Sequence, residues 1–591
     1  MAQLNFVVGD FEFNTRRMVQ SIEDARRQGA DLVVFSELSV CGYPPADLLN
    51  MDGFVKTCLD QLDHIAAACH GVAAIVGAPS FNDGPKGKKL YNSAFLLSDG
   101  KVQFRYDKGL LPTYDVFDEY RYFEPAEVFH TVPFMGKRIA LTVCEDLWDI
   151  GPRPMYRLHP MEQLAKESPD LIINISASPF SWNRCGERLS TFAENARRYN
   201  LPVFLVNQLG AHAELIFDGG SAAFNAGGGL AGHFEPFEEG LRLYDLNALG
   251  GGPGSDKAHA GDSAAGAENL SGAGPGQVSV GDSAAATNGH TAAGPGQEEK
   301  KNALLLDALV FGLKDYFRKT GLKKAILGLS GGLDSALTLV LAEMALGKEN
   351  VWAVLMPGPF SSDHSVRDAL TLAGNLGVRH DILPIDPVVN SVEDSLQAFF
   401  GDLPRDIAEE NIQARARAVL LMGLSNKFGH MLLNTSNKSE AAVGYGTLYG
   451  DMCGGLSVIG DLYKTEVYSL ARYINREKEI IPRNTIEKPP SAELRPGQKD
   501  SDSLPDYEIL DPVLFNYIEM EMHPTGIIAA GHEAELVNRV VRLVSANEFK
   551  RKQAPPVLRV SQKGFGVGRR MPIVAKYPEG TDYPESTAWP E

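Results

Sequence analysis

Residues 326–336 read ILGLSGGLDSA. The apolar run 325–329 stops at the small-residue turn 330–332, and a helical pattern follows over 333–346. A strand, a glycine turn and a helix N-terminus in this order commonly hold phosphate groups. A Walker-type loop would place Gly-Lys-Ser/Thr here, whereas this turn is followed by the carboxylate of Asp334. The stretch therefore predicts a phosphate-binding loop of a different kind, placed after a strand of an α/β domain.

The chain around this loop alternates between strand and helix patterns. The apolar runs KKAILGLS, VWAVLMP, RHDILPI and HMLLNTS are separated by helical patterns over 333–346, 363–376 and 407–428. This alternation predicts a parallel, doubly wound sheet. Functional residues of such a sheet gather at the carboxyl ends of its strands.

The first half of the chain has short β-rich runs, among them LNFVVG, DLVVFSE, AAIVGAPS, IALTVCED and PVFLVNQLG, with helical patterns such as 14–29 and 46–69 between them. They predict a second α/β domain with many strands. Residues 249–299 consist mostly of Gly, Ala, Ser and Pro and repeat GDSAA and GPGQ. Such a composition is typical of a flexible linker. We therefore expect domains over 1–248 and 300–591 with a linker over 249–299.

Bulk properties limit the class of protein. A chain of 591 residues is too long for one core, and its net charge of −19 argues against a protein that coats nucleic acid. Six cysteines give no CxxC pair, the N-terminus lacks the features of a signal peptide, and no run of about 18 apolar residues occurs. We expect a soluble, cytoplasmic protein with no nucleic-acid or membrane partner.

Three apolar runs of the first domain end in reactive residues. DLVVFSE ends at Glu37, KVQFRYDK ends at Lys108 and IALTVC ends at Cys144. A thiol needs a base to become a nucleophile, a poorly solvated carboxylate can accept that proton, and an ammonium can stabilise an oxyanion. Glu145 beside the thiol disfavours the thiolate, so a nearby cation is needed. Taken alone, a cysteine such as Cys144 is more often a buried structural residue than a nucleophile.

The segments FSELSVCGYPP, YDKGLLPTYDVFDEYRYF and VCEDLW resemble the nitrilase, or carbon–nitrogen hydrolase, family over nearly everything before the linker. The resemblance implies an αββα sandwich and a catalytic set of Cys144, Glu37, Lys108 and Glu119. It also implies that glutamine is bound by Tyr114, Ser178 and Arg184.

The loop SGGLDS resembles the pyrophosphate-binding loop of the N-type ATP pyrophosphatases, although a short motif alone could be a plain glycine turn. The longer segments 410–421 and 434–468 resemble NAD synthetases of the glutamine-dependent type. The resemblance implies an adenine nucleotide alpha hydrolase-like fold, with ATP as co-substrate and Mg²⁺ as cofactor. The implied ATP-binding residues are Gly328, Leu329, Ser330, Gly331, Gly332, Leu333, Asp334, Ser335, Thr435 and Lys464. The implied deamido-NAD-binding residues are Asn411, Arg415, Glu440, Asp451 and Lys550.

The implied metal ligands are Asp334 and Glu440. Taken singly, Lys464 and Lys550 could be solvated surface charges and Glu440 a helix-capping acid. One departure from related synthetases is Asn434, which stands where a glycine is common before the threonine. It could alter the turn without removing a ligand.

Together the resemblances imply an AMP-forming amidotransferase that converts deamido-NAD, ATP and glutamine to NAD, and a homo-oligomer. Another AMP-forming amidotransferase is the alternative within enzymes. Its asparagine-synthesising type uses an N-terminal cysteine, whereas Ala2 follows Met1 here. The alternative outside enzymes is a binding or scaffold protein with a retired nitrilase domain, which the intact Glu37, Lys108 and Cys144 argue against.

Overall fold

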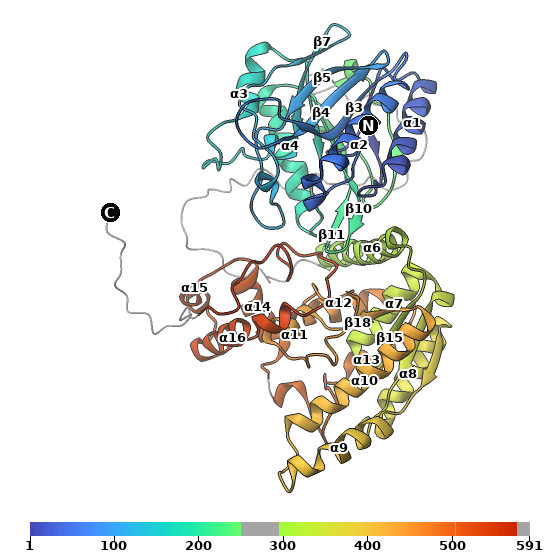
Figure 1. Cartoon of the computed structure of the whole chain (residues 1–591). Helices are drawn as coiled ribbons and strands as arrows, with labels where there is room; N and C mark the ends of the chain where they lie inside the picture. Colours follow the sequence, from blue (N-terminus) through green and yellow to red (C-terminus); the bar gives the residue numbers. More distant parts are fainter. Residues whose placement is uncertain (250–294, 503, 576–591) are drawn as a thin grey trace. The chain divides into compact units, whose positions relative to one another are not determined.

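The computed structural model describes residues 1–249, 295–502 and 504–575 (Figure 1). Most of the predicted linker 249–299 lies outside the described residues, and its last residues, from 295 on, begin helix α6. The described chain forms two compact units. The first holds residues 1–210 and 217–249, and the second holds 211–216 and the described residues from 295 onward. In these described ranges, no helix is both long and apolar enough to cross a membrane.

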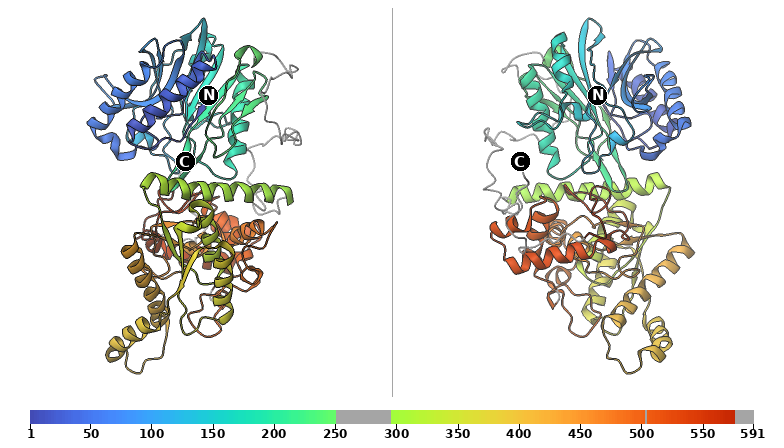
Figure 2. Two further views of the ribbon diagram at one scale, coloured as in Figure 1. Left: turned by 90° about the vertical axis from the view of Figure 1, so that its right-hand side faces the viewer. Right: turned by 60° about the vertical axis from the view of Figure 1, so that its left-hand side comes forward.

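The first unit is a sandwich of two sheets (Figure 2). One sheet has the order β2-β3-β4-β5 and the other β13-β12-β9-β8-β7-β6. The strands of the first sheet are β2 (Leu32–Val34), β3 (Ala73–Phe81), β4 (Leu90–Ser98) and β5 (Lys101–Asp107). Those of the second are β6 (Val132–Phe134), β7 (Lys137–Val143), β8 (Leu171–Ser176), β9 (Val203–Asn207), β12 (Ala222–Phe224) and β13 (Leu230–His233).

Apolar side chains of both sheets share one core. Ile75 and Leu96 of the first sheet belong to the same buried cluster as Leu141 and Ile173 of the second. The principal helices are α1 (Phe11–Arg27), α2 (Asp52–Ala66), α3 (Pro160–Leu164) and α4 (Arg184–Tyr199). Helix α2 packs on β3 and α4 on β9, so each sheet carries helices on its other face. The predicted αββα sandwich is thereby confirmed.

The run LNFVVG is less regular than its pattern predicts. Strand β1 covers only Ala2–Gln3, where it pairs with β14 (Gly240–Leu241). The Asn14 side chain hydrogen-bonds both the N–H and the carbonyl of Val7, at 2.9 and 2.8 Å. These side-chain bonds replace a sheet partner, because an Asn amide can satisfy a backbone donor and acceptor together.

The second unit contains the predicted parallel sheet, with the order β17-β16-β15-β18-β19. Its strands are β15 (Ala325–Gly328), β16 (Val351–Leu355), β17 (Arg379–Ile382), β18 (Met431–Asn434) and β19 (Leu456–Ser457). The chain moves from β15 to one edge and then returns to add β18 on the other side. The switch point therefore lies between β15 and β18, where doubly wound sheets bind ligands.

Helices surround this sheet, and three of them begin and end as the sequence predicts: α7 (Leu333–Leu346), α8 (Asp363–Leu376) and α10 (Ile407–Phe428). The others near the sheet are α6 (Pro295–Thr320), α9 (Asp386–Phe400), α11 (Lys438–Val443), α12 (Lys464–Ile474) and α13 (Arg483–Glu487). Beyond them, α14 (Tyr507–Ile518), α15 (Pro524–Ala529), α16 (Ala534–Ala546) and α17 (Glu548–Arg551) follow. Buried side chains of α14 and α16 pack with α11 in a separate cluster.

Candidate active sites

Lys108 lies between two carboxylates inside the first unit. Its Nζ is 2.7 Å from Oε1 of Glu37 and 2.8 Å from Oε2 of Glu119. Asn92 donates from Nδ2 to Glu37 at 2.8 Å, and Tyr43 donates its hydroxyl to Glu119 at 3.0 Å. All five side chains are buried. The structure thus brings together three of the four predicted catalytic residues in a single hydrogen-bonded cluster.

Cys144, the fourth, occupies a sharp bend directly after β7. Its φ is +43°, a left-handed conformation that is uncommon for a residue with a side chain and is often found at functional sites. Asp146 fixes this bend, because its carboxylate accepts the N–H of Val143 at 2.9 Å and those of Gly109 and Leu110 at 3.1 and 2.9 Å. The bend that carries the thiol is therefore fastened to the segment that follows Lys108.

The charges of this cluster influence one another. Burial raises the pKa of Cys144 well above its ordinary value, Glu37 adds to the rise and Lys108 opposes it. Burial alone would lower the pKa of Lys108, but Glu119 and Glu37 raise it well above its usual range. Burial also raises the pKa of Glu119, against the effect of Lys108. The arrangement places the thiol near an ammonium, which favours the thiolate, and near a carboxylate that could take its proton.

Two of the three predicted glutamine-binding residues, Tyr114 and Arg184, lie near Glu145, the residue after the thiol. Tyr114 donates its hydroxyl to the Glu145 carboxylate at 2.9 and 3.0 Å. The Arg184 guanidinium lies over the Trp148 ring, 5.4 Å from its centroid. Within the described residues, Nε of Arg184 and Oγ of Ser178 are buried without a hydrogen-bond partner. Burial of such groups is costly unless a ligand completes them.

The phosphate-loop prediction fits the geometry of the second unit. Gly331 has φ +83°, and a Cβ built there would lie 2.2 Å from the carbonyl oxygen of Ser365. Only glycine fits such a position. Helix α7 begins at Leu333 after Gly332, which offers no side-chain cap. The first N–H groups of α7 thus lack a side-chain acceptor, as phosphate-binding helix ends do.

Two predicted metal ligands and a predicted ATP-binding lysine meet beside this loop. Lys464 Nζ donates to Oδ2 of Asp334 and lies 3.6 Å from Oε1 of Glu440. Asn437 donates from Nδ2 to Oδ1 of Asp334 at 2.9 Å. Glu440 also completes the capping box of α11 with Asn437, so it does cap a helix, as the alternative interpretation expects. Its position in the pocket wall is a separate feature. Burial and the nearby Asp334 raise the pKa of Glu440 to about 8.

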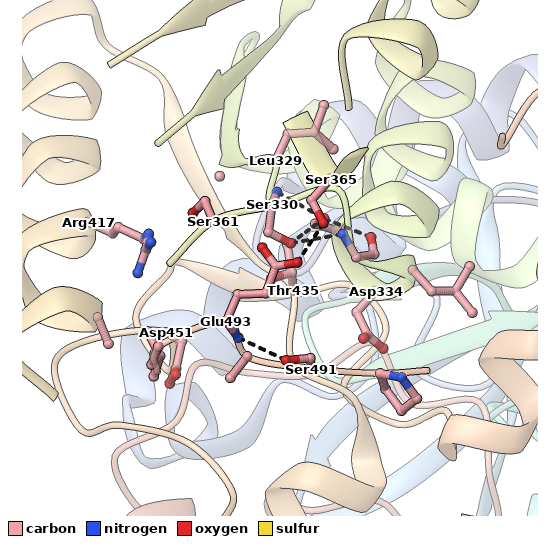
Figure 3. A pocket seen from close by; sticks show the side chains of 18 of the residues that line it. Leu329, Ser330, Asp334, Ser361, Ser365, Arg417, Thr435, Asp451, Ser491 and Glu493 are labelled. Carbon is pink, nitrogen blue, oxygen red and sulfur yellow. Dashed lines mark hydrogen bonds between the residues drawn. The ribbon is translucent and has the colours of Figure 1, made fainter. Parts of the chain in front are cut away.

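These groups line a pocket of about 580 Å³ at the switch point of the sheet. Figure 3 shows Ser330, Asp334, Thr435 and Asp451 around it. Every predicted ATP-binding residue except Gly331 lines the pocket, and so do Glu440 and Asp451.

The remaining deamido-NAD candidates, Asn411, Arg415 and Lys550, are not among the residues that line the pocket. They form hydrogen bonds with the segment 444–451. Asn411 accepts the Thr447 hydroxyl at 2.7 Å. Arg415 donates to the Leu448 carbonyl at 3.2 Å, and Lys550 donates to the carbonyls of Gly444 and Gly446. Asp451, in the same segment, accepts the Thr447 N–H at 2.7 Å. The four predicted residues therefore converge on one loop.

Several residues of these sites are not among the sequence predictions. Asn92, Tyr43 and Asp146 hold the first cluster, and Asn437 holds Asp334. Asn434, noted as a departure, ties its loop to the carbonyls of Asp451 and Cys453 at 2.9 and 3.2 Å. The position of Asp146 two residues after Cys144 is the one available signal. Asn92, Tyr43 and Asn437 lie 55, 76 and 103 residues from their partners and carry no local pattern.

Comparison with known proteins finds two families, each matching a different part of the chain. The carbon–nitrogen hydrolase family matches residues 1–249 and the NAD synthase family matches residues 305–554. A glutamine-dependent NAD(+) synthetase of a Synechocystis strain is 43% identical over 98% of this chain and 99% of its own length. The Thermotoga maritima protein of the same name is 39% identical over 98% of each chain.

Among solved structures, a glutamine-dependent NAD+ synthetase from Acinetobacter baumannii, in complex with adenosine diphosphate, is 35% identical. It matches with a TM-score of 0.71 over 98% of this chain and 99% of its own. A synthetase of Cytophaga hutchinsonii, at 21% identity and a TM-score of 0.77, supports the fold. With both sites built on matching domains in the same order, this chain belongs to the glutamine-dependent NAD(+) synthetase family.

Proposed function

We propose that this protein converts deamido-NAD, ATP, glutamine and water to NAD, AMP, diphosphate and glutamate. The observation that carries the proposal is the presence, on one chain, of a buried Glu37–Lys108–Cys144 cluster and a phosphate loop whose carboxylate Asp334 meets Lys464. The first can release ammonia from an amide. The second can activate a carboxylate for amide formation. The names of the relatives support the same pairing of activities.

In the first site, the Cys144 thiol attacks the side-chain carbonyl carbon of glutamine and its proton passes to Glu37. The carbon–nitrogen bond then breaks, the proton leaves with ammonia, and a γ-glutamyl thioester remains for water to hydrolyse. Lys108 stabilises the oxyanion. The Glu145 carboxylate, buried and held by Tyr114, accepts the α-ammonium of glutamine, while Arg184 binds its α-carboxylate.

In the second site, the nicotinate carboxylate attacks the α-phosphorus of ATP and diphosphate leaves. Ammonia from the first site then attacks the acyl adenylate, and AMP leaves. The N-terminal N–H groups of α7 and the Lys464 ammonium hold the departing diphosphate. Exclusion of water matters, because ammonia becomes ammonium in neutral solution and is then no nucleophile.

Asp334 and Glu440 fit a Mg²⁺ ion. Magnesium in nucleotide sites is held by one or two carboxylates together with substrate phosphates. Here the two carboxylates lie on either side of a single ammonium, that of Lys464, and both line the pocket beside the phosphate loop. When bound, the ion neutralises phosphate charge.

The proposal is tested by mass balance. Purified protein is mixed with deamido-NAD, ATP, Mg²⁺ and glutamine, and NAD, AMP and glutamate are quantified together. Near-equal yields of the three products support the proposal. Glutamate without NAD or AMP would leave the first site intact and exclude deamido-NAD as the acceptor. A cytoplasmic location and a homo-oligomer stay predictions.

A further inference from the structure

Two charged groups of the second site come from the first turns of two different helices. Glu440 lies in the first turn of α11, and Lys464 is the first residue of α12. These helices pack on each other, and both pack on α14 (Figure 1). The structure describes every residue of α14, and none of them lines the pocket. The distance between the ammonium and the carboxylate therefore depends on how α11, α12 and α14 are fixed to one another.

A single carboxylate of α14 is hydrogen-bonded to both of the other helices. Oδ1 of Asp511 accepts the Ser439 hydroxyl at 2.6 Å. Its Oδ2 accepts the N–H and the hydroxyl of Thr465, at 2.9 and 2.8 Å. Ser439 precedes Glu440 and Thr465 follows Lys464, so each donor is the direct neighbour in the chain of a residue that lines the pocket.

Ser439 also joins the two helices directly. Its hydroxyl oxygen accepts the backbone N–H of Lys464 at 2.9 Å, while its proton is donated to Asp511. The first two N–H groups of α12 are thus satisfied by side chains of α11 and α14. The main chain that carries the Lys464 ammonium is held from outside its own helix.

This polar connection lies within helices that already pack through apolar side chains. Leu510, Val513 and Leu514 of α14 belong to one buried cluster with Val443 of α11. Asp511 is also fully buried, and its three hydrogen-bond donors are uncharged. Burial of a carboxylate costs free energy that an apolar residue in its place would not. What the hydrogen bonds add to the apolar packing is a single defined arrangement of the helices.

We propose that Asp511 is a positioning residue of the second site, which fixes the Lys464 ammonium relative to Glu440 through Ser439 and Thr465. The inference rests on the proposed function for the reaction that is measured. Nζ of Lys464 lies 3.6 Å from Oε1 of Glu440, and a shift of α12 against α11 would change that distance. A displaced charge weakens stabilisation of the transition state more than it weakens substrate binding.

The test compares kcat and KM for NAD formation from ammonia, well below the melting temperature. Asp511→Asn keeps one acceptor oxygen, so it loses the connection to Ser439 or to Thr465. We expect kcat to fall about 10- to 100-fold and the KM for deamido-NAD to stay within about twofold of wild type. The dissociation constant of inorganic diphosphate, measured by calorimetry on the full chain, should rise about threefold or more because Lys464 is displaced.

A double-mutant cycle tests whether the effect passes through the hydroxyl of α11. Ser439→Ala removes one partner of Asp511 and should also lower kcat. If both changes break the same connection, the double variant Ser439→Ala/Asp511→Asn should be less than about threefold slower than the slower single variant. If Asp511→Asn does not fold, Thr465→Val, which removes one of its three hydrogen bonds, takes its place in the kcat and diphosphate measurements.

Two controls separate this role from effects of charge and of stability. Glu508→Gln removes an exposed carboxylate from the same helix. Val540→Ala opens a cavity in the apolar cluster that contains α14, and should lower the melting temperature. Neither side chain is bonded to the connection, so both variants should keep kcat within about twofold of wild type.

A kcat of Asp511→Asn within twofold of wild type, or a fall in kcat that Val540→Ala reproduces, would overturn the assignment. Fully additive effects in the cycle would overturn it as well. Failure of the proposed function would instead appear as absence of NAD formation by the wild type. In that case the diphosphate affinities, which need no turnover, would still support the positioning role if they weaken and contradict it if they do not.

Discussion

The two sites hold their charges in different ways. In the first unit, the side chains of Lys108, Glu37 and Glu119 are 0%, 1% and 5% exposed, and the ammonium contacts both carboxylates. In the second unit, Asp334 and Glu440 keep 18% and 17% of their side-chain surface at the wall of an open pocket. Both clusters thus set two carboxylates against one ammonium, but the first is closed to solvent, whereas the second lies at the wall of a pocket that a ligand can enter. A buried, hydrogen-bonded cluster holds a nucleophile in a fixed geometry, whereas a substrate site has to stay accessible.

Removing the thiol should have the largest effect, and it should affect NAD formation from glutamine but not from ammonia. Cys144→Ala should abolish NAD formation from glutamine, by at least about 1,000-fold, because no other group can form the thioester. Synthesis from ammonia should stay within about threefold of wild type. Rates of NAD formation with each nitrogen donor measure this. Equal loss with both donors would contradict the division into two sites.

Changing the charge of the second site should have the opposite pattern. Asp334→Asn should lower synthesis from both donors by about 100-fold and weaken the response to Mg²⁺, because one carboxylate of the pair is lost. Hydrolysis of glutamine, followed as glutamate, should continue. An unchanged Mg²⁺ dependence would show that this carboxylate is no metal ligand.

A smaller effect is expected at the substrate end of the first site. Glu145→Gln should lower kcat/KM for glutamine by about 10- to 100-fold, because the acceptor for the α-ammonium loses its charge. Tyr114→Phe, which removes only the hydroxyl that holds Glu145, is the matched control and should cost less. If Glu145→Gln lowers kcat/KM equally for an amide that lacks the α-amino group, the carboxylate does not act by binding the α-ammonium.

The pH response of the free thiol tests the electrostatics of the same site. Burial and Glu37 disfavour the thiolate and raise the pKa of Cys144. Alkylation by iodoacetamide, which requires the thiolate, should therefore keep rising with pH and reach no plateau below about pH 9. The rate is measured with the Cys144→Ala variant as background. A plateau with a midpoint below pH 8 would mean that Lys108 dominates.

Deletion of residues 255–294 should have the smallest effect. The segment has the composition of a linker without chemistry, so both glutamine- and ammonia-dependent rates should stay within about twofold. A selective fall in glutamine use would show that the segment takes part in coupling the two activities.

The comparison also explains what could be read from the sequence. The candidate residues Glu37, Lys108 and Cys144 stand at the ends of apolar runs, and Ser330 to Ser335 follow another, so the sequence draws attention to them, but the family resemblance gives them their predicted roles. The switch point between β15 and β18 then brings Thr435 to the phosphate loop, as the alternation predicts.

The supporting residues could not be read in this way. Asn92 reaches Glu37 across 55 residues, and Asn437 reaches Asp334 across 103. Such contacts depend on the packed fold and leave no period or motif in the chain. The left-handed backbone conformation of Cys144 could not be predicted from the sequence either, because a non-glycine residue adopts it only when the surrounding structure enforces it.

The central claim is that nitrogen released at Cys144 is the nitrogen used beside Asp334. The most direct test supplies glutamine labelled with ¹⁵N at the side-chain amide, together with an excess of unlabelled ammonium, and measures ¹⁵N in the NAD formed. The account predicts NAD labelled almost completely, because the ammonia is consumed before it equilibrates with the solution. NAD whose label matches the bulk ammonium pool would contradict it.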